Sequence, residues 1–260
     1  MATVASKTGK ENGFKVIGTQ TLGLRGLVLW LKFNEGSGSV AKDSSLYNNH
    51  GTIYGATWTD GKFGKALSFD GSDDYVEVAD SESLTVTDAV TVLAWINWAE
   101  VKDCMLLQKK VIGQPDDYQE YSIVPKLWAT APNDRFEAYI DGTLINSGYY
   151  LEDLINTGEW AQIGIVYAGD AIAGTGNAYV KFVVNGEVIA TKSAPASITN
   201  SGGTLLIGEH TSGGATSPAD GDFHFKGVID EVRIYNRALS EEEIQMLYYN
   251  RIGAVPSKVI

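Results

Sequence analysis

KGVIDEVRIYNRALS, residues 226–240, reads as a β-strand that contains one unexpected carboxylate. Successive side chains of a strand point to opposite faces, so Asp230 is predicted to share a face with Val228 and Val232. The apolar neighbours indicate that this face meets the core. A buried carboxylate without a partner costs on the order of several kcal/mol. The sequence therefore predicts that Asp230 is paired, hydrogen-bonded or bound to a metal ion.

The rest of the chain from residue 24 consists of short β-type runs separated by Gly, Asn, Asp and Ser. The predicted strands are 26–33, 66–69, 74–78, 90–98, 136–140, 161–167, 178–184, 187–192, 204–208 and 227–235. Tight hairpin turns are indicated at Asp141-Gly142 and Asn185-Gly186, because both dipeptides tolerate the positive φ values of a type I′ turn. With 29 glycines and no alternation of strands with helices, the sequence predicts an all-β, two-sheet antiparallel sandwich.

One short C-terminal helix is indicated by SEEEIQMLYYNR, residues 240–251. Ser240 is the predicted N-cap, and Glu243 completes a capping box with it. Ile244, Leu247 and Tyr248 fall on one side of this helix, so we expect them to pack against the sandwich.

Composition narrows the possible partners. The 260 residues include 20 basic and 32 acidic side chains, a formal charge of −12, and no basic stripe that would indicate a nucleic-acid binder. No apolar run approaches the roughly 18 residues of a membrane span, so no membrane insertion is predicted. Cys104 is the only cysteine and is expected to be a small buried hydrophobe.

The sequence favours one domain with two extensions. Residues 1–23 read as a polar N-terminal arm, residues 24–252 as the domain, and residues 253–260 as a C-terminal tail. The first twenty residues lack the pattern of a secretory signal, so we expect either that a signal was removed or that the protein leaves its cell by another route. An extended arm of this length reaches tens of ångströms at about 3.3 Å per residue, enough to dock on a neighbouring subunit.

Two stretches carry a resemblance to a known family. LVLWLKFNEGSGSVAKDSSLYNNHGTIYGATWTDGKFGKALSFDGSDDYVEV and, much later, FKGVIDEVRIYNRALSEEEI resemble the laminin-G-like branch of the concanavalin-A-like jelly rolls, over roughly residues 26–250. The resemblance implies a two-sheet jelly roll with its terminal strands side by side. It also implies a non-catalytic module that binds glycans or proteins, often with a structural calcium ion. Residues 100–135 and 209–224 look longer than the loops usual in that family, so no ligand specificity is carried over from them.

The resemblance places the first loop, KDSSLYNNHG (42–51), near the penultimate strand. This loop is dense in hard oxygen ligands, which Ca²⁺ prefers. The predicted calcium ligands are Glu35, Asp43, Asn48 or Asn49, and Asp230. The alternative is that no metal binds and that Asp230 accepts hydrogen bonds from the backbone amides of this loop, or pairs with Arg233 or Arg237.

Catalytic patterns are weak. Glycosidases need two carboxylates about 5–10 Å apart, and the candidates DDYVE (73–77) and DDYQE (116–120) read as a turn followed by a strand and as a solvated loop. The three histidines, His50, His210 and His224, do not form the cluster that a jelly-roll polysaccharide lyase would use. We therefore predict no catalytic residues and no enzyme activity.

Sugar rings stack on exposed aromatic side chains. The candidates for such a role are Tyr118, Tyr121, Trp128, Tyr149 and Tyr150. The leading hypothesis is a non-catalytic recognition or adhesion module, glycan-binding and calcium-stabilised, in an extracellular or virion-surface setting. There it would act as a decoration, fibre or other assembly component that contacts capsid or neighbouring subunits through its arm. The alternatives are a carbohydrate-binding module of a secreted polysaccharide-active protein, and a glycoside hydrolase or polysaccharide lyase of the jelly-roll class.

Overall fold

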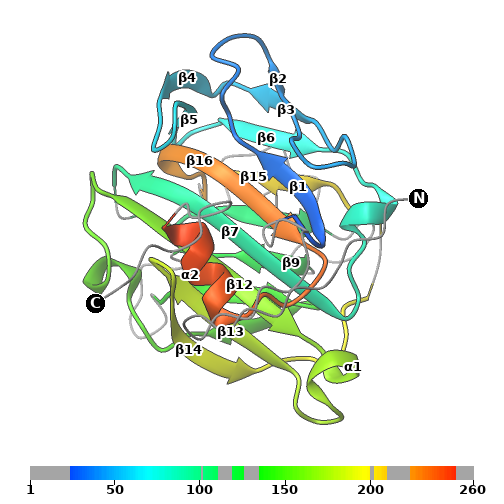
Figure 1. Cartoon of the computed structure of the whole chain (residues 1–260). Coiled ribbons are helices and arrows are strands. Elements are labelled where there is room, and N and C mark those ends of the chain that lie inside the picture. Colours follow the sequence, from blue (N-terminus) through cyan, green and yellow to red (C-terminus); the bar gives the residue numbers. More distant parts are fainter. Residues whose placement is uncertain are drawn as a thin grey trace, which may run out of the picture.

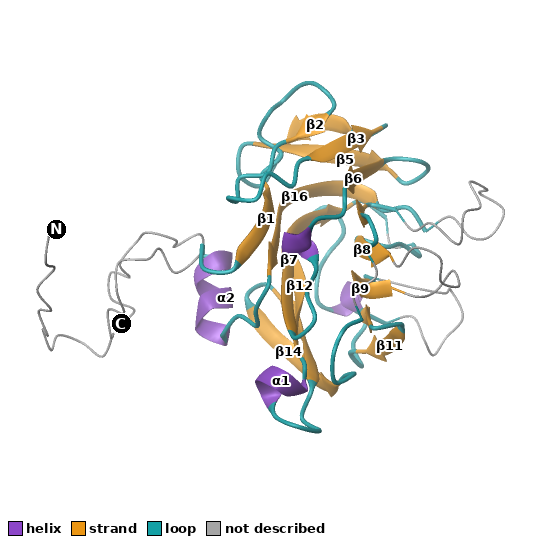
Figure 2. Ribbon diagram, turned by 90° about the vertical axis from the view of Figure 1, so that its right-hand side faces the viewer, coloured by secondary structure: helices purple, strands orange, loops and turns teal. Residues whose placement is uncertain are grey.

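The structure, a computed structural model, describes residues 24–100, 102–110, 119–125, 135–199, 202–209 and 223–249. Two antiparallel sheets of eight strands each pack face to face (Figures 1 and 2). This arrangement confirms the predicted all-β, two-sheet antiparallel jelly-roll sandwich. The predicted arm, residues 1–23, and tail, residues 253–260, lie outside the described residues.

Sheet A contains the strand quoted at the outset. Its order is β14 (Glu187–Ser193), β13 (Tyr179–Val184), β12 (Trp160–Ala168), β7 (Ala89–Trp98), β16 (Lys226–Tyr235), β5 (Lys65–Asp70) and β4 (Thr57–Asp60), and β1 (Leu27–Leu31) also pairs with β16. The first half of β16 pairs with β5 and the second half with β1. The strands near the two ends of the domain therefore lie side by side, as the family resemblance implies (Figure 1).

Sheet B is the second layer. Its order is β11 (Thr143–Asn146), β10 (Glu137–Ile140), β9 (Gln119–Ile123), β8 (Leu107–Lys110), β15 (Leu205–Ile207), β6 (Tyr75–Val78), β3 (Gly51–Tyr54) and β2 (Val40–Ala41). The short helical elements are η1 (Glu82–Leu84), η2 (Leu151–Asp153), α1 (Asp170–Ala173) and α2 (Glu241–Tyr248). The sequence did not indicate β2, β3, β4 and β9 as strands, whereas β8 lies in the strand-like stretch around Cys104 and β11 follows the predicted turn at Asp141-Gly142.

Local turn chemistry fixes both predicted hairpins. Asp141 and Gly142, between β10 and β11, have φ values of 49° and 71°. Asn185 and Gly186, between β13 and β14, have φ values of 50° and 82°. Positive φ at both central residues gives the turn a twist that matches the flanking strands.

The core lies between the sheets and is built by alternation along each strand. From β7, the core receives Val90, Val92, Ala94, Ile96 and Trp98. The odd-numbered residues of the same strand face outward, where Leu93 joins a second apolar cluster beneath α2. Cys104 is fully buried in the main core, which confirms its predicted place.

Helix α2 packs on the outer face of sheet A (Figure 2). Ser240 accepts a hydrogen bond from the amide of Glu243, and the Glu243 carboxylate accepts one from the amide of Ser240, which confirms the predicted capping box. Ile244 and Leu247 are buried against sheet A, and the Tyr248 ring stacks on a sheet residue, Trp95. The predicted packing side of the helix is therefore confirmed.

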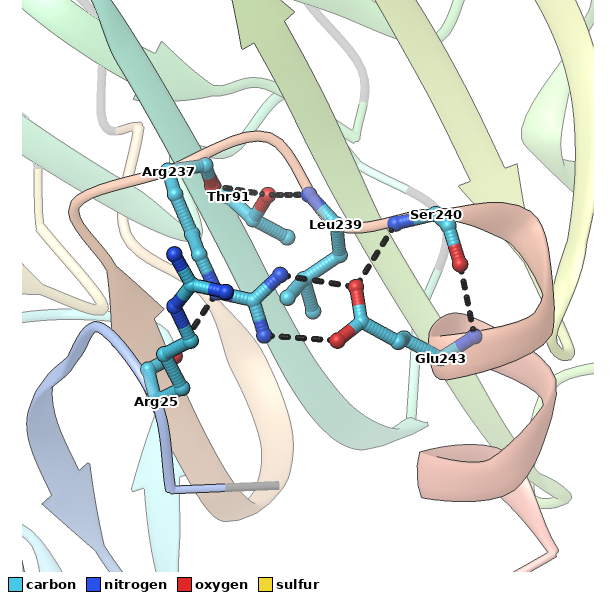
Figure 3. Close-up of polar contacts among 6 residues, drawn as sticks. All are labelled: Arg25, Thr91, Arg237, Leu239, Ser240 and Glu243. Carbon is cyan, nitrogen blue, oxygen red and sulfur yellow. Dashed lines mark hydrogen bonds and ion pairs between the residues drawn. The ribbon is translucent and has the colours of Figure 1, made fainter. Parts of the chain in front are cut away.

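The segment that leads into α2 is hydrogen-bonded to β7 and to Arg25, which precedes β1 (Figure 3). The guanidinium of Arg237 makes a bidentate pair with Glu243, at 2.7 and 2.8 Å, and donates to the carbonyl of Arg25 at 2.7 Å. The fully buried Thr91 hydroxyl donates to the Arg237 carbonyl at 2.8 Å and accepts from the Leu239 amide at 3.0 Å. One hydroxyl thus satisfies two backbone groups.

Replacing Thr91 by Val should destabilise the protein by about 1–3 kcal/mol, because it leaves both backbone groups without their partner while preserving side-chain shape. Urea denaturation followed by circular dichroism measures the loss. Thr91→Ser keeps the hydroxyl and is the matched control, with a smaller loss expected. Equal stability of Thr91→Val and wild type would contradict this role of the hydroxyl.

Candidate functional site

The Asp230 side chain lies on the opposite face from the one that the sequence predicted. Ile229, Val232 and Ile234 face the core, so two residues separate the first two of them instead of one. The register of β16 against β7 shifts between Asp230 and Arg233, and Glu231 has a φ of 54°. This β-bulge inserts an extra residue and turns the first half of the strand over. The prediction that Asp230 shares a face with Val232 is therefore wrong.

Asp230 is nevertheless completely buried, outside the core, beneath the turn that joins β4 and β5. Its Oδ2 accepts a hydrogen bond from the amide of Phe63 at 2.9 Å. Its Oδ1 is buried and has no hydrogen-bond partner. Burial raises the pKa of Asp230 to about 7, against the opposing effect of the backbone amides of Phe63, Glu231 and Lys62. The carboxylate thus has one oxygen in use and one available.

The partners proposed for Asp230 in the absence of a metal are engaged elsewhere. Arg233 pairs with Glu231, and Arg237 pairs with Glu243. Asp230 accepts its hydrogen bond from the Phe63 amide in the β4–β5 turn, and not from an amide of the loop at 42–51. Neither arginine pair includes Asp230, so no cation of the described residues neutralises it.

Glu35 lies on a segment that contacts the same turn. Its Oε1 accepts from the Lys42 amide at 3.0 Å, while its Oε2 is buried without a partner. Next to it, Asn34 accepts from the Lys65 amide at 2.7 Å. The turn approaches so closely that a Cβ at Gly64 would lie 2.2 Å from the Asn34 Oδ1.

The geometry of the β4–β5 turn suits a hard cation. A Cβ at Gly61 would lie 2.7 Å from both the Asp230 Oδ2 and the Lys65 carbonyl oxygen, so glycine allows the turn to approach both oxygens closely. Two buried carboxylate oxygens, Oε2 of Glu35 and Oδ1 of Asp230, have no hydrogen-bond partner. Calcium takes such carboxylate and carbonyl oxygens as ligands. These oxygens are of the type that the ion implied by the family resemblance takes as ligands.

The remaining predicted ligands lie elsewhere. Asp43 organises its own loop by accepting hydrogen bonds from the amides of Trp30, Ser45 and Asn49 and from the Ser45 hydroxyl. The Asn49 amide group donates to the carbonyl of Val28 and to a serine hydroxyl. Asn48 is exposed at the turn of the loop, with a φ of 59°. Within the described ranges, the carboxylates of Glu35, Asp43 and Asp230 do not gather within 4.8 Å of one another.

Three aspartates gather where β5 ends and β6 begins, and two of them belong to the DDYVE stretch (73–77) that was considered above as a carboxylate pair. Asp70, Asp73 and Asp74 place their oxygens within 4.8 Å of one another. Asp74 is buried and accepts from the Asp70 amide at 2.7 Å, and burial raises its pKa. The hydrogen bond and the strand that follows confirm the prediction of a turn plus strand for residues 73–77.

The predicted sugar platforms divide into three groups. Tyr118 and Trp128 lie outside the described residues. Tyr121 is fully buried in the core, where burial raises its pKa well above the usual value, so the prediction of a sugar platform is wrong for this residue. Tyr149 is 47% exposed, and the ring of Tyr150 carries the Arg135 guanidinium 4.9 Å from its centre. Only Tyr149 and Tyr150 remain as described candidates from that set.

In the described part of the chain, no helix is long and apolar enough to cross a membrane. The family model of the concanavalin A-like lectin/glucanases superfamily matches residues 70–245. No curated protein matches the sequence.

Solved structures with this fold come from several kinds of protein. Domain 4 of AbnA, an extracellular arabinanase of Geobacillus stearothermophilus in complex with arabinotriose, is 20% identical, with a TM-score of 0.62 over 85% of this chain and 98% of that one. The binding domain of Paraclostridial Mosquitocidal Protein 1 is 18% identical, with a TM-score of 0.60 over 89% of this chain and 53% of that one. Trypanosoma rangeli sialidase is 17% identical, with a TM-score of 0.60 over 88% of this chain and 34% of that one. At these identities the likeness concerns the fold.

Proposed function

Because the chain belongs to the concanavalin A-like lectin/glucanase superfamily, we propose that it is a non-catalytic recognition domain that binds glycans outside the cell. The observation that carries the proposal is that tyrosine rings stand exposed on a rigid two-sheet frame, Tyr149 at 47% and Tyr54 at 42%. Exposed aromatic rings on or beside strands suit the apolar face of a sugar, since little side-chain entropy is lost on binding. Among the similar structures, one contains arabinotriose and another is a sialidase.

The carboxyl groups favour recognition over hydrolysis. A glycosidase uses one carboxyl group of raised pKa beside a second carboxylate, on either side of a bound sugar. The pKa values of Asp74 and Asp230 are raised, but both side chains are buried, Asp230 completely. A protonated carboxyl group that cannot reach a substrate cannot act as its acid. The alternative, a hydrolase or lyase, predicts release of reducing or unsaturated sugar ends from a polysaccharide panel.

The proposal includes a structural calcium ion held by Glu35, Asp230 and carbonyl oxygens of the β4–β5 turn. The two carboxylate oxygens without hydrogen-bond partners support it. The ion would supply the positive charge that Asp230 lacks and would join β16 to the β4–β5 turn. It would have no role in chemistry, only in the stability of this end of sheet A.

A narrower proposal concerns the setting. The polar arm at residues 1–23 suits a virion-surface or other assembly component that docks on neighbouring subunits, while a free-standing module of a secreted protein would not need it. Deletion of residues 2–22 separates the two: an assembly component loses incorporation, whereas a free-standing module keeps both its fold and its glycan binding.

A glycan array probed with the whole chain tests the function, once in about 2 mM calcium, which exceeds the Kd of a typical extracellular site, and once in chelator. We expect binding to a limited set of glycans, weakened when calcium is removed. The control is protein unfolded and labelled in the same way. A blank array under both conditions, from protein that melts cooperatively, would contradict glycan recognition.

A further inference from the structure

The outer face of sheet B carries a pair of stacked aromatic rings that the sequence did not single out. Tyr54 on β3 and Tyr75 on β6 are directly opposite each other in the strand register. Their ring centres are 4.5 Å apart and their planes differ by 15°. Their neighbours Ile53 and Val76 point into the core, so both rings stand on the outer face. Tyr54 is 42% exposed, which leaves part of the stack open to solvent.

The chain around this pair is fixed. Gly55, directly after Tyr54, has a φ of 71°, and a Cβ there would lie 2.0 Å from the Asp74 Oδ1. Asp74, directly before Tyr75, is held by the amide of Asp70 at 2.7 Å. The backbone is thus constrained directly after Tyr54, the last residue of β3, and directly before Tyr75, the first residue of β6. A platform that is already ordered loses little conformational entropy when it binds.

Two glutamates lie near the stack. Glu77 lies on the same face as Tyr75, two residues along β6, and is directly opposite the exposed Thr52. The pKa of Tyr75 is raised, first by burial and next by the negative charges of Glu209 and Glu77. Both glutamates therefore lie close enough to act on the tyrosine hydroxyl. The surface beside the rings offers hydrogen-bond acceptors and a negative potential.

We propose that Tyr54, Tyr75 and Glu77 form a binding site for a ring of a neutral polysaccharide. The proposal rests on the proposed glycan-binding function and gives it a place and a sugar class. The apolar face of the sugar lies on the exposed Tyr54 ring, which Tyr75 supports from behind. The Glu77 carboxylate and the Thr52 hydroxyl accept hydrogen bonds from sugar hydroxyls, and a carboxylate acceptor makes the stronger of the two. The negative charges of Glu77 and Glu209 disfavour uronic and sialic acids.

This site differs from the candidates that the sequence offered. Tyr149 follows β11 at one edge of sheet B, whereas β3 is next to the opposite edge strand, β2. A single sugar ring cannot bridge an eight-stranded sheet, whose neighbouring strands are about 4.8 Å apart. The two locations can therefore be separated by mutation.

Isothermal titration calorimetry on the full chain tests the site, with arabinotriose and cellohexaose as neutral probes and hexagalacturonate as the acidic probe. We expect a neutral probe to bind wild type, Tyr54→Ala to weaken that binding at least about tenfold, and Tyr54→Phe to keep it within about threefold, since alanine removes the ring on which the sugar lies and phenylalanine keeps it. Glu77→Gln should weaken the neutral probe severalfold and lessen the discrimination against the acidic one. Tyr47→Ala, which removes another half-exposed tyrosine, is the matched control and should bind like wild type.

The outcomes separate this site from the general function. Binding lost in Tyr149→Ala and intact in Tyr54→Ala would overturn the site and leave glycan recognition standing. Preference for hexagalacturonate would overturn the sugar class. A wild-type protein that binds none of the probes and is blank on the array would overturn the proposed function, and this site with it. Melting curves that match wild type would show that Tyr54→Ala acts on binding and not on folding.

Discussion

Asp230→Asn should stabilise the metal-free protein at pH 8 and abolish its stabilisation by calcium. The wild-type carboxyl group has a pKa of about 7 in the folded chain, against an ordinary value of 3.8, because it is buried. Between these pH values the native state holds a proton that the unfolded state has released. The free energy of unfolding of wild type therefore falls as the pH rises from about 4 to about 7, and then stays level.

The expected size of this effect is on the order of 3 kcal/mol, because each unit of pKa shift corresponds to about 1.4 kcal/mol and solvent screening reduces the total. The asparagine side chain would resemble the protonated carboxyl group and would not titrate, so the variant should match wild type near pH 4 and exceed it at pH 8. Urea denaturation at pH 4, 6 and 8 in chelator measures the difference. Parallel stability curves for the two proteins would show that Asp230 ionises without a penalty.

With calcium at pH 8, wild type is expected to gain stability relative to Asp230→Asn. The ion binds the ionised carboxylate, so at pH 8 a calcium concentration about 100 times Kd should add about 2.7 kcal/mol to the wild-type stability. Asp230→Asn and Glu35→Gln should lose most of this gain. Asp43→Asn is the matched control: it weakens the loop at residues 42–51 but should keep the calcium-dependent shift. A shift that survives in Asp230→Asn and disappears in Asp43→Asn would restore the ligand set centred on the first loop.

The fold could be predicted because turn and helix-cap residues specify local structure, and tertiary contacts did not change that structure. Asp141-Gly142 and Asn185-Gly186 specify their turns through backbone preferences of two residues, and Ser240 with Glu243 specifies the start of α2 in the same way. The placement of Asp230 depended instead on an unbroken two-residue period along β16. One inserted residue at a bulge reverses every side chain on one side of it.

The bulge itself left no readable signal. Its residue of positive φ is Glu231, where glycine or asparagine would have been the usual indication. The alternation in GTIY, by contrast, contained a usable signal: Ile53 is apolar, and its neighbours Thr52 and Tyr54 are suited to an exposed face. Tyr121 was misplaced because β9 was not predicted as a strand, so its inward direction could not be assigned.

Replacing Glu231 by Ala should destabilise the protein by on the order of 3–5 kcal/mol, the range for breaking one side of a buried ion pair. Glu231 and Arg233 are 5% and 3% exposed and pair with each other. The Glu231 carboxylate also accepts from the Trp30 indole at 2.8 Å, and the Arg233 guanidinium lies 4.6 Å from the centre of that ring. Without the carboxylate, the guanidinium stays buried with the tryptophan face as its remaining described contact.

The substitution isolates the side chain from the backbone, because alanine at a φ of 54° carries a conformational cost similar to that of glutamate. Glu231→Gly is the matched comparison: it removes the same carboxylate but suits this φ, so it should be the more stable of the two. Glu231→Ala with Arg233→Met should recover at least half of the loss, since the second change removes the uncompensated charge. Guanidinium chloride denaturation of wild type, Glu231→Ala, Arg233→Met and the double variant measures the coupling.

Two results would show that the Glu231–Arg233 ion pair does not stabilise the bulge. One is a loss below about 1 kcal/mol in Glu231→Ala, the size of an ordinary substitution, and the other is no recovery in the double variant. Either would mean that backbone pairing of β16 with β1 and β7 fixes the bulge. In that case the buried ion pair would not set the direction in which Asp230 points.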